Sequence, residues 1–310
     1  MAADSLPHVL VTGAGGFVGK ALVRALSNRH SVTATDSTAL DFSDMPDVVA
    51  ITGNLEDPDL IAAITAKPCA ALIHLATVPG GAAEADPALA ARINVGASMA
   101  LIDAAAAHGN CPRVIFASSI AVFGDPLPDH VDDETPLKPM LRYGAHKAMV
   151  EEWIATMTRR GAISGLSLRL PGIVARPLAP SGMKSAFLSN VFHALQAGAP
   201  ITLPVSPQAS CWLLSRHVLV GQLQHALRLT DDPADARLTL PALRVIMGNL
   251  VAEIARQTGT DSTLASYMPD PAIEAAFGNQ PPLSTPRADG LRFHHDGSLE
   301  VLVAHALAEL

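Results

Sequence analysis

The stretch HVLVTGAGGFVGKALVRAL, from His8 to Leu26, decides the fold of this chain. Its first part, Val9 to Thr12, is a short apolar run that predicts a buried strand. The part after it predicts a helix, because apolar residues recur at helical spacing at Phe17, Val18, Ala21, Leu22, Ala25 and Leu26. Between the two lie glycines three residues apart, at Gly13, Gly16 and Gly19. Such a turn predicts a phosphate cradle, because glycines let the backbone approach a pyrophosphate and the helix start offers N–H donors.

Other interpretations of this turn are open. The common dinucleotide fingerprint G-x-G-x-x-G would need a glycine at Val18. A P-loop aligned on Gly19 and Lys20 would need a glycine at Ala14 and a hydroxyl at Ala21, and no magnesium ligand is offered. The last alternative is a tight turn that binds nothing. Three glycines after an opening strand near the start of the chain favour the cradle.

Composition limits the class of protein. A chain of 310 residues with 49% hydrophobic residues can bury a large core, and we expect one large domain with a smaller lobe. The formal charge of −8 argues against a nucleic-acid partner. Cys69, Cys111 and Cys211 form no C-x-x-C pattern, which favours a reducing compartment. The first residues lack a signal peptide, and no apolar run is expected to span a bilayer, so we expect a cytoplasmic protein without a membrane partner.

Strands and helices alternate over the first half of the chain, which predicts an α/β fold with a doubly wound parallel sheet. The expected strands are Ser31 to Thr35, Val48 to Thr52, Ala70 to Leu75, Val114 to Ala117 and Gly165 to Leu170. The expected helices are Leu60 to Ala66, Ala88 to His108 and Gly144 to Arg159. Beyond them, proline-rich segments separate short helices, Phe187 to Ala197 and Val218 to Leu229. We therefore expect a nucleotide-binding domain over 1–172 and a smaller, mainly substrate-binding lobe over 173–310, interleaved with it.

Asp36 ends the second expected strand, 17 residues beyond Gly19. A carboxylate at this place accepts hydrogen bonds from the adenosine ribose of a dinucleotide. No Lys or Arg occurs between Arg29 and Lys67, so no cation is available for a 2′-phosphate. NAD is therefore preferred over NADP as the cofactor. The alternative is that Asp36 is an ordinary solvated loop residue.

Tyr143 and Lys147 form the pattern Y-x-x-x-K at the start of an expected helix. Residues four apart share one helix face, so the ammonium can lie near the phenol. A phenol with an ordinary pKa of about 10 is a poor base at neutral pH, and a nearby positive charge favours the phenolate. The pair thus predicts a proton acceptor. A packed tyrosine with a solvated lysine is the alternative.

Ser118 and Ser119 follow the strand expected at Val114 to Ala117. Ligands of a doubly wound sheet sit beyond the carboxyl ends of its strands, where a serine hydroxyl can hold a substrate oxygen. Both serines could instead be turn residues. The sequence contains no G-x-S-x-G elbow and no H-E-x-x-H, so acyl transfer and a metal site are unsupported.

Taken together, these motifs resemble the extended short-chain dehydrogenase/reductase family. The stretches that carry the resemblance are TGAGGFVG, Asp36, HLAT at His74 to Thr77, NVGA at Asn94, SSIAVFG at Ser118 to Gly124, and YGAHK at Tyr143 to Lys147. The resemblance implies a Rossmann domain that binds NAD, with Tyr143 as proton acceptor or donor. It also implies that Lys147 holds the ribose and lowers the tyrosine pKa, and that Ser119 orients the substrate.

The resemblance further implies which residues contact the cofactor and the substrate. For NAD they are Gly13, Gly16, Phe17, Val18, Gly19, Asp36, Asn54, Leu55, Leu75, Ala76, Thr77, Asn94, Ala117, Tyr143, Lys147, Pro171 and Ile173. For the substrate they are Thr77, Ser118, Ser119, Tyr143 and Arg176. No metal ligand is implied, and a homodimer through the helices that begin near Ala88 and Gly144 is implied.

Within the family, the stretches ATVPGGAAEAD, RLPGIVARP and CWLLSRHVLV look most like enzymes that oxidise the C2 hydroxyl of a four-carbon sugar acid. Nucleotide-sugar epimerases and dehydratases usually carry an arginine shortly before the residue that corresponds to Trp212. Ser210 and Cys211 stand there instead, which disfavours a buried diphosphate. Arg176 is the expected carboxylate clamp, with an exposed loop arginine as the alternative. A nucleotide-sugar epimerase or dehydratase and a non-catalytic NAD-binding regulator stay open.

Overall fold

The computed structural model describes residues 7–178, 184–230, 233 and 235–310. Its contacts divide the chain into two compact units that are each assembled from three segments. The first unit comprises 1–119, 141–169 and 223–238. The second comprises 120–140, 170–222 and 239–310. The two units interleave along the chain, because 120–140 lies in the second unit and 223–238 in the first.

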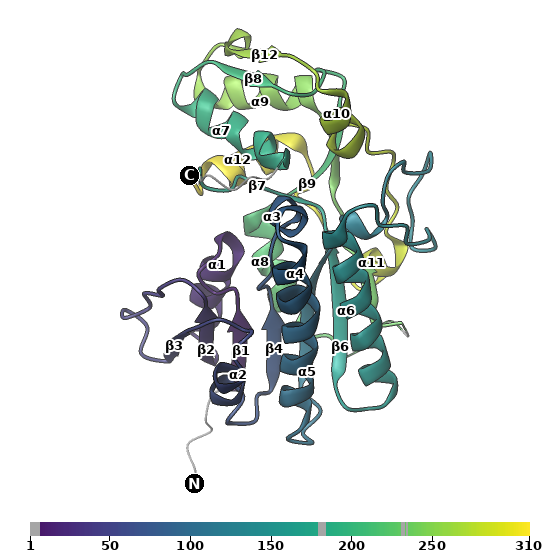
Figure 1. The fold of residues 1–310 in the computed structure, drawn as a ribbon. Helices are drawn as coiled ribbons and strands as arrows, with labels where there is room; N and C mark the ends of the chain where they lie inside the picture. The colour runs from purple at the N-terminus through teal and green to yellow at the C-terminus, as the bar shows by residue number, and fades with distance from the viewer. Residues whose placement is uncertain (1–6, 179–183, 231–232, 234) are drawn as a thin grey trace. The chain divides into compact units, whose positions relative to one another are not determined.

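A seven-stranded sheet forms the centre of the first unit (Figure 1). The strand order is β10-β6-β5-β4-β1-β2-β3, and β1 pairs in parallel with both β2 and β4. Because β2 and β4 lie on opposite sides of β1, the strand order reverses there, which is where such sheets bind ligands. The doubly wound fold expected from the sequence is confirmed. The strands are β1 (His8–Thr12), β2 (Ser31–Asp36), β3 (Val48–Thr52), β4 (Ala71–His74), β5 (Arg113–Ser119), β6 (Ser164–Leu170) and β10 (Arg237–Thr239).

Apolar helix faces cover this sheet. Leu101 and Ile102 of α5 and Ile154 of α6 are fully buried against strand residues such as Leu10 and Leu72. Asp57 caps α2 and Asp86 caps α4, each followed by a proline that suits a first helical turn. The helices are α1 (Phe17–Leu26), α2 (Pro58–Ile64), α3 (Gly80–Ala85), α4 (Pro87–Ala91), the π-helix η1 (Arg92–Ala97), α5 (Ser98–Ala106) and α6 (Arg142–Arg159).

The long helix expected from Ala88 is not continuous. A π-helical turn, η1, interrupts it, and a separate short helix, α3, precedes it. The run from Pro87 to Ala106 is also long and apolar enough to cross a membrane, with a mean hydropathy of 1.3. The expectation that no run has this length was therefore wrong. Leu101, Ile102 and Ala105 of this run are core residues of the first unit, which accounts for its apolar composition.

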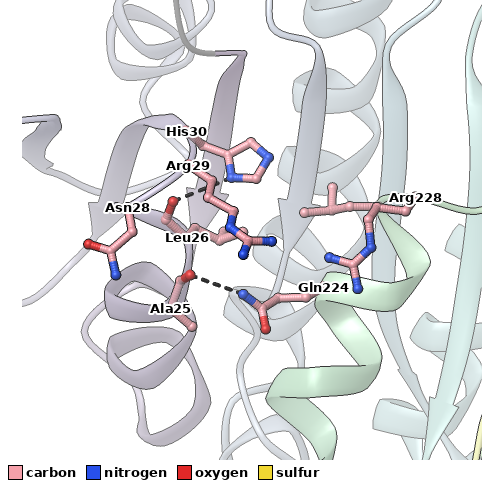
Figure 2. A pocket seen from close by; sticks show the side chains of 8 residues that line it. Ala25, Leu26, Asn28, Arg29, His30, Gln224 and Arg228 are labelled. Carbon is pink, nitrogen blue, oxygen red and sulfur yellow. Dashed lines mark hydrogen bonds between the residues drawn. The ribbon is translucent and has the colours of Figure 1, made fainter.

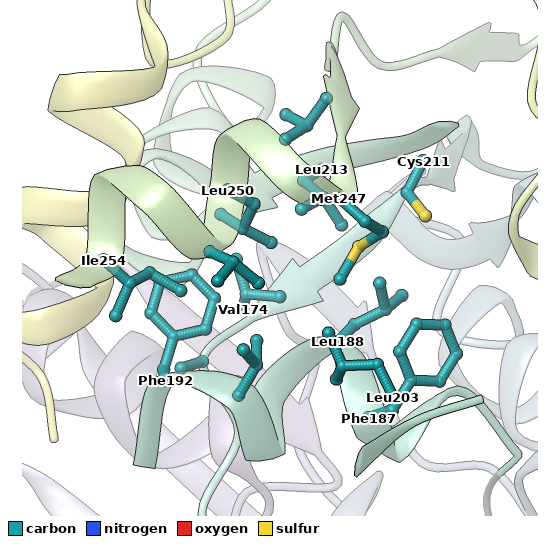
Figure 3. Close-up of a cluster of buried hydrophobic side chains, with 14 of the residues drawn as sticks. Val174, Phe187, Leu188, Phe192, Leu203, Cys211, Leu213, Met247, Leu250 and Ile254 are labelled. Carbon is teal, nitrogen blue, oxygen red and sulfur yellow. The ribbon is translucent and has the colours of Figure 1, made fainter. Parts of the chain in front are cut away.

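The second unit has its own sheets and core. A three-stranded sheet has the order β11-β9-β7, and β8 pairs with β12. Its core gathers Phe192 of α7, Met247, Leu250 and Ile254 of α9, and Val174 of β7 (Figure 3). The strands are β7 (Gly172–Val174), β8 (Ile201–Leu203), β9 (Ser210–Ser215), β11 (Leu243–Ile246) and β12 (Ala265–Tyr267). The helices from Ile120 onward, apart from α6, are η2 (Ile120–Val122), η3 (Lys184–Ala186), α7 (Phe187–Gln196), α8 (Arg216–Ala226), α9 (Met247–Thr258), η4 (Ser262–Leu264), α10 (Pro271–Phe277), α11 (Pro286–Gly290) and α12 (Leu299–Leu307).

Candidate active site

The glycine turn between β1 and α1 is closely packed by backbone. A Cβ added at Gly19 would lie 2.1 Å from the Gly13 carbonyl oxygen, and one at Gly13 would lie 2.7 Å from the Ala76 nitrogen. Gly13 also has a φ of +70°, which favours glycine. Gly16 caps α1 without a side-chain hydrogen bond, and the first turn, which includes Phe17 and Val18, carries no acidic residue. This turn fits a pyrophosphate, since it offers backbone N–H groups and a positive helix end, and the first turn of α1 carries no carboxylate.

Asp36 lies at the end of β2, beside this turn. One of its carboxylate oxygens accepts from the Gly15 backbone N–H at 2.9 Å. The other accepts from the Thr38 backbone N–H and hydroxyl, both at 3.0 Å. These bonds fix the carboxylate at the edge of the glycine turn, where it can accept from a ribose hydroxyl. The geometry therefore fits NAD at this position.

The loop after β4 is held by Asn94. Its side-chain oxygen accepts from the Val78 N–H at 2.7 Å and from the Thr77 hydroxyl at 3.1 Å, and its side-chain nitrogen donates to the Val78 carbonyl at 2.9 Å. Asn94 belongs to the π-helical turn and is buried. The amide thus positions Thr77 and the preceding Ala76. Asn94 shapes the wall of the site, and its own polar groups are already engaged.

Three further residues expected to contact NAD have different surroundings. Asn54 accepts from the Glu56 N–H at 3.1 Å and donates to the Glu56 carboxylate at 3.0 Å. Leu55 is buried in the core of the first unit. Leu75 follows β4 and donates its N–H to the Thr12 carbonyl at 3.2 Å.

The structure places Tyr143 and Lys147 next to each other in the first turns of α6. The Lys147 Nζ lies 5.5 Å from the centre of the Tyr143 ring and 4.5 Å from that of Phe116. It donates to the Ala117 carbonyl at 2.7 Å and is buried. Burial lowers the pKa of Lys147 to about 7, while the charge of Glu151 acts in the opposite direction. The ammonium is therefore tied to the end of β5 and lies beside the phenol ring.

Glu84 fixes the start of α6, a role that the sequence analysis missed. Its carboxylate accepts from the Arg142 backbone N–H and from the Arg142 guanidinium, both at 2.7 Å. The hydrogen bond from the Arg142 N–H lowers the pKa of Glu84. Because Arg142 directly precedes Tyr143, this contact fixes the position of the backbone from which the Tyr143 side chain extends. Glu84 and Arg142 are 58 residues apart in sequence, and no local pattern reveals their contact.

Ser118 and Ser119 have different environments at the end of β5. The Ser118 hydroxyl is buried and donates to Glu151 at 2.5 Å, and Arg169 binds the same carboxylate with its Nη2 at 2.9 Å. The Ser118 hydroxyl proton is therefore engaged by Glu151 and is not available to a substrate, whereas the sequence led us to expect that Ser118 contacts one. Ser119 is partly exposed at the last position of the strand. Of these two serines, Ser119 is the better placed to hold a substrate oxygen.

Pro171, Ile173 and Arg176 belong to the second unit, where Pro171 directly precedes β7, Ile173 lies within it and Arg176 follows it. Pro171 and Ile173 are buried and Arg176 is partly exposed. The Arg176 backbone is held on both sides, because its N–H donates to the Ser189 hydroxyl at 3.0 Å and its carbonyl oxygen bonds the His193 Nε2 at 2.7 Å.

Arg244 is a further cation that the sequence analysis missed. It lies on β11, which pairs with β9 so that Arg244 is opposite Trp212. Its Nε donates to the Gln280 carbonyl at 2.7 Å, and its Nη2 donates to the Ser210 hydroxyl at 3.2 Å. A guanidinium from the neighbouring strand thus lies beside Ser210, although no arginine shortly precedes Trp212 in the sequence. Only the register of two strands distant in sequence brings it there.

The buried histidine under the site predicts an acid sensitivity. His74 bonds the Thr12 hydroxyl at 2.6 Å and the Ser98 hydroxyl at 2.8 Å. Burial, and next the charge of Lys147, lower the pKa of His74 to about 3. Since the folded-state pKa lies below the ordinary 6.5, the unfolded chain binds the extra proton first as the pH falls. Stability is therefore lost from about pH 6.5 downward, by roughly 2 kcal/mol at pH 5.

Urea unfolding at pH 7.5 and pH 5 checks this expectation. The wild-type protein should lose roughly 2 kcal/mol more stability between these values than a His74→Gln variant, which cannot take up the proton. Equal losses in the two proteins would contradict it.

The close packing of the glycine turn predicts how NAD binding responds to an added methyl group. Gly19→Ala should weaken NAD binding by at least about tenfold, because a Cβ cannot lie 2.1 Å from the Gly13 carbonyl and the turn must open. Calorimetric titration with NAD measures the change. Gly221→Ala on α8 is the matched control, since nothing lies within 4 Å of its added Cβ. Unchanged affinity in Gly19→Ala would contradict the fit.

Among the described residues, no group of three or more His, Cys, Asp and Glu side chains could hold a metal ion. The site therefore combines a glycine turn for a dinucleotide with a phenol and an ammonium at the carboxyl edge of a parallel sheet. These features define an α/β enzyme with a dinucleotide cofactor.

Comparison with known proteins identifies the family. Residues 9–209 match the NAD dependent epimerase/dehydratase family, and this chain belongs to it. The family expected from the sequence is thereby confirmed, and NAD is the cofactor. D-erythronate dehydrogenase from Cupriavidus necator is 33% identical over 312 residues, 96% of each chain. D-erythronate dehydrogenase from Haemophilus influenzae is 30% identical and covers 81% of this chain and 82% of its own. The chain is an NAD-dependent dehydrogenase.

Solved structures support the same fold. The nucleoside-diphosphate-sugar epimerase from Agrobacterium tumefaciens superposes with a TM-score of 0.88 at 28% identity, over 98% of this chain and 94% of its own. The GalE-like L-threonine dehydrogenase from Cupriavidus necator, in its holo form, gives a TM-score of 0.83 at 23% identity, over 97% and 99%. The second likeness concerns the fold alone.

Proposed function

We propose that this enzyme oxidises the C2 hydroxyl of a small sugar acid, of the D-erythronate type, to the 2-keto acid. The observation that carries the proposal is the 33% identity to D-erythronate dehydrogenase over 96% of both chains, combined with the adjacent Tyr143 and Lys147. NAD supplies the acceptor for the hydride from C2. The residues of the chain then have to position the alcohol and remove its proton.

Tyr143 is the proposed general base. Its phenol oxygen takes the hydroxyl proton as the C2–H bond breaks, and the nearby Lys147 ammonium stabilises the negative charge on the phenolate. Ser119 donates to the oxygen that becomes the carbonyl. Lys147 can serve this role because the Ala117 carbonyl and Glu151 favour its charged form against the cost of burial.

The substrate carboxylate requires a cation. Arg176 is the proposed cation, and its backbone is held by Ser189 and His193. A guanidinium can bind a carboxylate through two parallel hydrogen bonds.

Steady-state kinetics test whether Arg176 binds the substrate carboxylate. Replacing the residue that binds the carboxylate should raise KM for the sugar acid by about tenfold to a hundredfold and leave the Kd of NAD unchanged. We expect this of Arg176→Gln. Arg160→Gln, which replaces an exposed arginine at the end of α6, is the matched control and should leave KM unchanged. Unchanged KM in Arg176→Gln would exclude Arg176 as the clamp.

The experiment that tests the function is a substrate panel. The enzyme is mixed with NAD and four-carbon to six-carbon aldonic acids of each configuration at C2 and C3, and NADH is followed by its absorbance. The proposal expects NADH with at least one four-carbon acid of a single C2 configuration. If no aldonic acid yields NADH while NAD binds normally, the proposed function is wrong.

A nucleotide-sugar epimerase or dehydratase is the second candidate, and the Agrobacterium tumefaciens structure favours it. Such an enzyme would retain NAD tightly and convert a nucleotide sugar without net NADH. A non-catalytic NAD-binding regulator would show neither reaction. Incubation with nucleotide sugars, followed by chromatography of the products, separates these alternatives from the sugar-acid dehydrogenase.

We further propose a cytoplasmic homodimer. Met149, which is 56% exposed on α6, is an apolar side chain available to such an interface. Light scattering on the purified protein tests the oligomeric state.

A further inference from the structure

A cavity of about 570 Å³ lies at the end of α1 that is distant from the glycine turn. It is lined by Ala25, Leu26, Asn28, Arg29, His30, Gln224, Leu227 and Arg228, all of which belong to the first unit. Gln224 donates to the Ala25 carbonyl at 3.0 Å and so ties the two lining segments together, although they are 199 residues apart in sequence. Figure 2 shows this bond and the side chains around the cavity. The cavity is therefore a built part of the first unit.

Two guanidinium groups point toward one another across this cavity, those of Arg29 and Arg228 (Figure 2). Both side chains are exposed, and no carboxylate of the described residues lies within 4.0 Å of either. None of the described residues that line the cavity is acidic. Asp231 and Asp232 follow Arg228 in the sequence and lie outside the described residues. Two adjacent positive charges repel each other unless an anion joins them.

We propose that this cavity binds a phosphate group, as inorganic phosphate or as the phosphate of a small metabolite. Each guanidinium can donate two parallel hydrogen bonds to oxygens of a tetrahedral dianion. His30 bonds the Leu26 carbonyl through Nδ1 at 3.3 Å, and the Asn28 amide adds a neutral donor at the rim. The two lining segments lie at the carboxyl ends of α1 and α8. The negative dipole ends of these helices disfavour a bound anion, so the two arginines have to supply the attraction.

The site is distinct from the cradle proposed for the dinucleotide. α1 has 10 residues and is thus about 15 Å long, with the glycine turn at its start and the cavity at its end. A phosphate bound in the cavity therefore does not compete with the NAD pyrophosphate. This separation allows the two sites to be tested independently.

Calorimetric titration with inorganic phosphate, in saturating NAD and at an ionic strength held constant with sodium chloride, tests the proposal. We expect saturable binding with one site per chain. Arg29→Gln and Arg228→Gln should each weaken it by about tenfold or more. Arg160→Gln is the matched control, because Arg160 is an exposed arginine at the end of α6 without an ion pair among the described residues. Its affinity for phosphate should stay within about twofold of the wild type.

A second titration with glycerol phosphate distinguishes the source of the phosphate group. Tighter binding of glycerol phosphate than of inorganic phosphate assigns the site to a phosphorylated metabolite, and the reverse assigns it to free phosphate. Absence of saturable binding of both ligands overturns the proposal. Equal loss of affinity in Arg160→Gln overturns it as well, since binding would then follow net charge. Unchanged NAD affinity shows that each variant is folded.

Discussion

Tyr143→Phe is expected to lower turnover of the sugar acid by about 10²–10⁴-fold while the Kd of NAD changes little. The substitution removes one oxygen from a ring that lies 5.5 Å from the Lys147 Nζ. Without that oxygen the proposed base is removed, whereas the glycine turn and Asp36 that fit NAD are unaltered. Single-turnover formation of NADH and calorimetric titration with NAD measure the two quantities separately.

The chain provides a matched control, because it contains only two tyrosines. Tyr267 lies on β12 in the second unit and packs against the core of that unit. Tyr267→Phe removes the same oxygen and should leave turnover within about twofold of the wild type. If Tyr143→Phe keeps most of the activity, the general base lies elsewhere.

Glu151→Leu is expected to destabilise the protein by about 3–5 kcal/mol, because it leaves a buried arginine without its counter-charge. The Glu151 side chain is fully buried and the Arg169 side chain is 8% exposed. Arg169 binds the carboxylate through Nη2 at 2.9 Å and through Nε at 3.1 Å. Ser118 at the end of β5 also loses its acceptor. Urea unfolding at neutral pH measures the change in the free energy of unfolding.

Two further variants show whether the loss of stability arises because the Glu151 carboxylate is buried or only because a negative charge is removed. Glu152, the next residue, pairs with Arg159 and Arg237 but its side chain is 58% exposed, so Glu152→Leu should cost only about 0–1 kcal/mol. The double variant Glu151→Leu with Arg169→Met removes both buried charges and should recover much of the lost stability. A small effect of Glu151→Leu alone would show that the arginine reaches solvent.

Much of the fold follows from sequence because its signals are local. The run Val9 to Thr12, the glycines after it and the apolar spacing of the next helix lie within 19 residues, so period and turn chemistry define them together. Strand β7 has only three residues, and β8 and β12 likewise. These strands pair with distant segments, and short runs without a period of their own cannot be recognised from sequence.

Some features of the candidate site can likewise be predicted from sequence, and others cannot. Tyr143 and Lys147 are four residues apart on one helix, so sequence alone predicts their proximity. The engagement of Ser118 with Glu151 depends on α6 packing against β5, a tertiary contact that serine preferences do not reveal. The position of Arg244 beside Ser210 depends on the register of β11 and β9. Glu151 follows Lys147 by one helical turn, and this spacing could have predicted that its carboxylate lies near the site.

The segmented assembly of the first unit limits how the enzyme can be divided. Residues 223–238 return to this unit, and Ala236 there accepts the Ser167 N–H at 2.8 Å. β10 pairs with the outer side of β6. An amino-terminal fragment cut near residue 172 would leave the polar backbone of β6 bare and prone to join other chains. Genetic shuffling between relatives would therefore have to exchange non-contiguous pieces of this gene together.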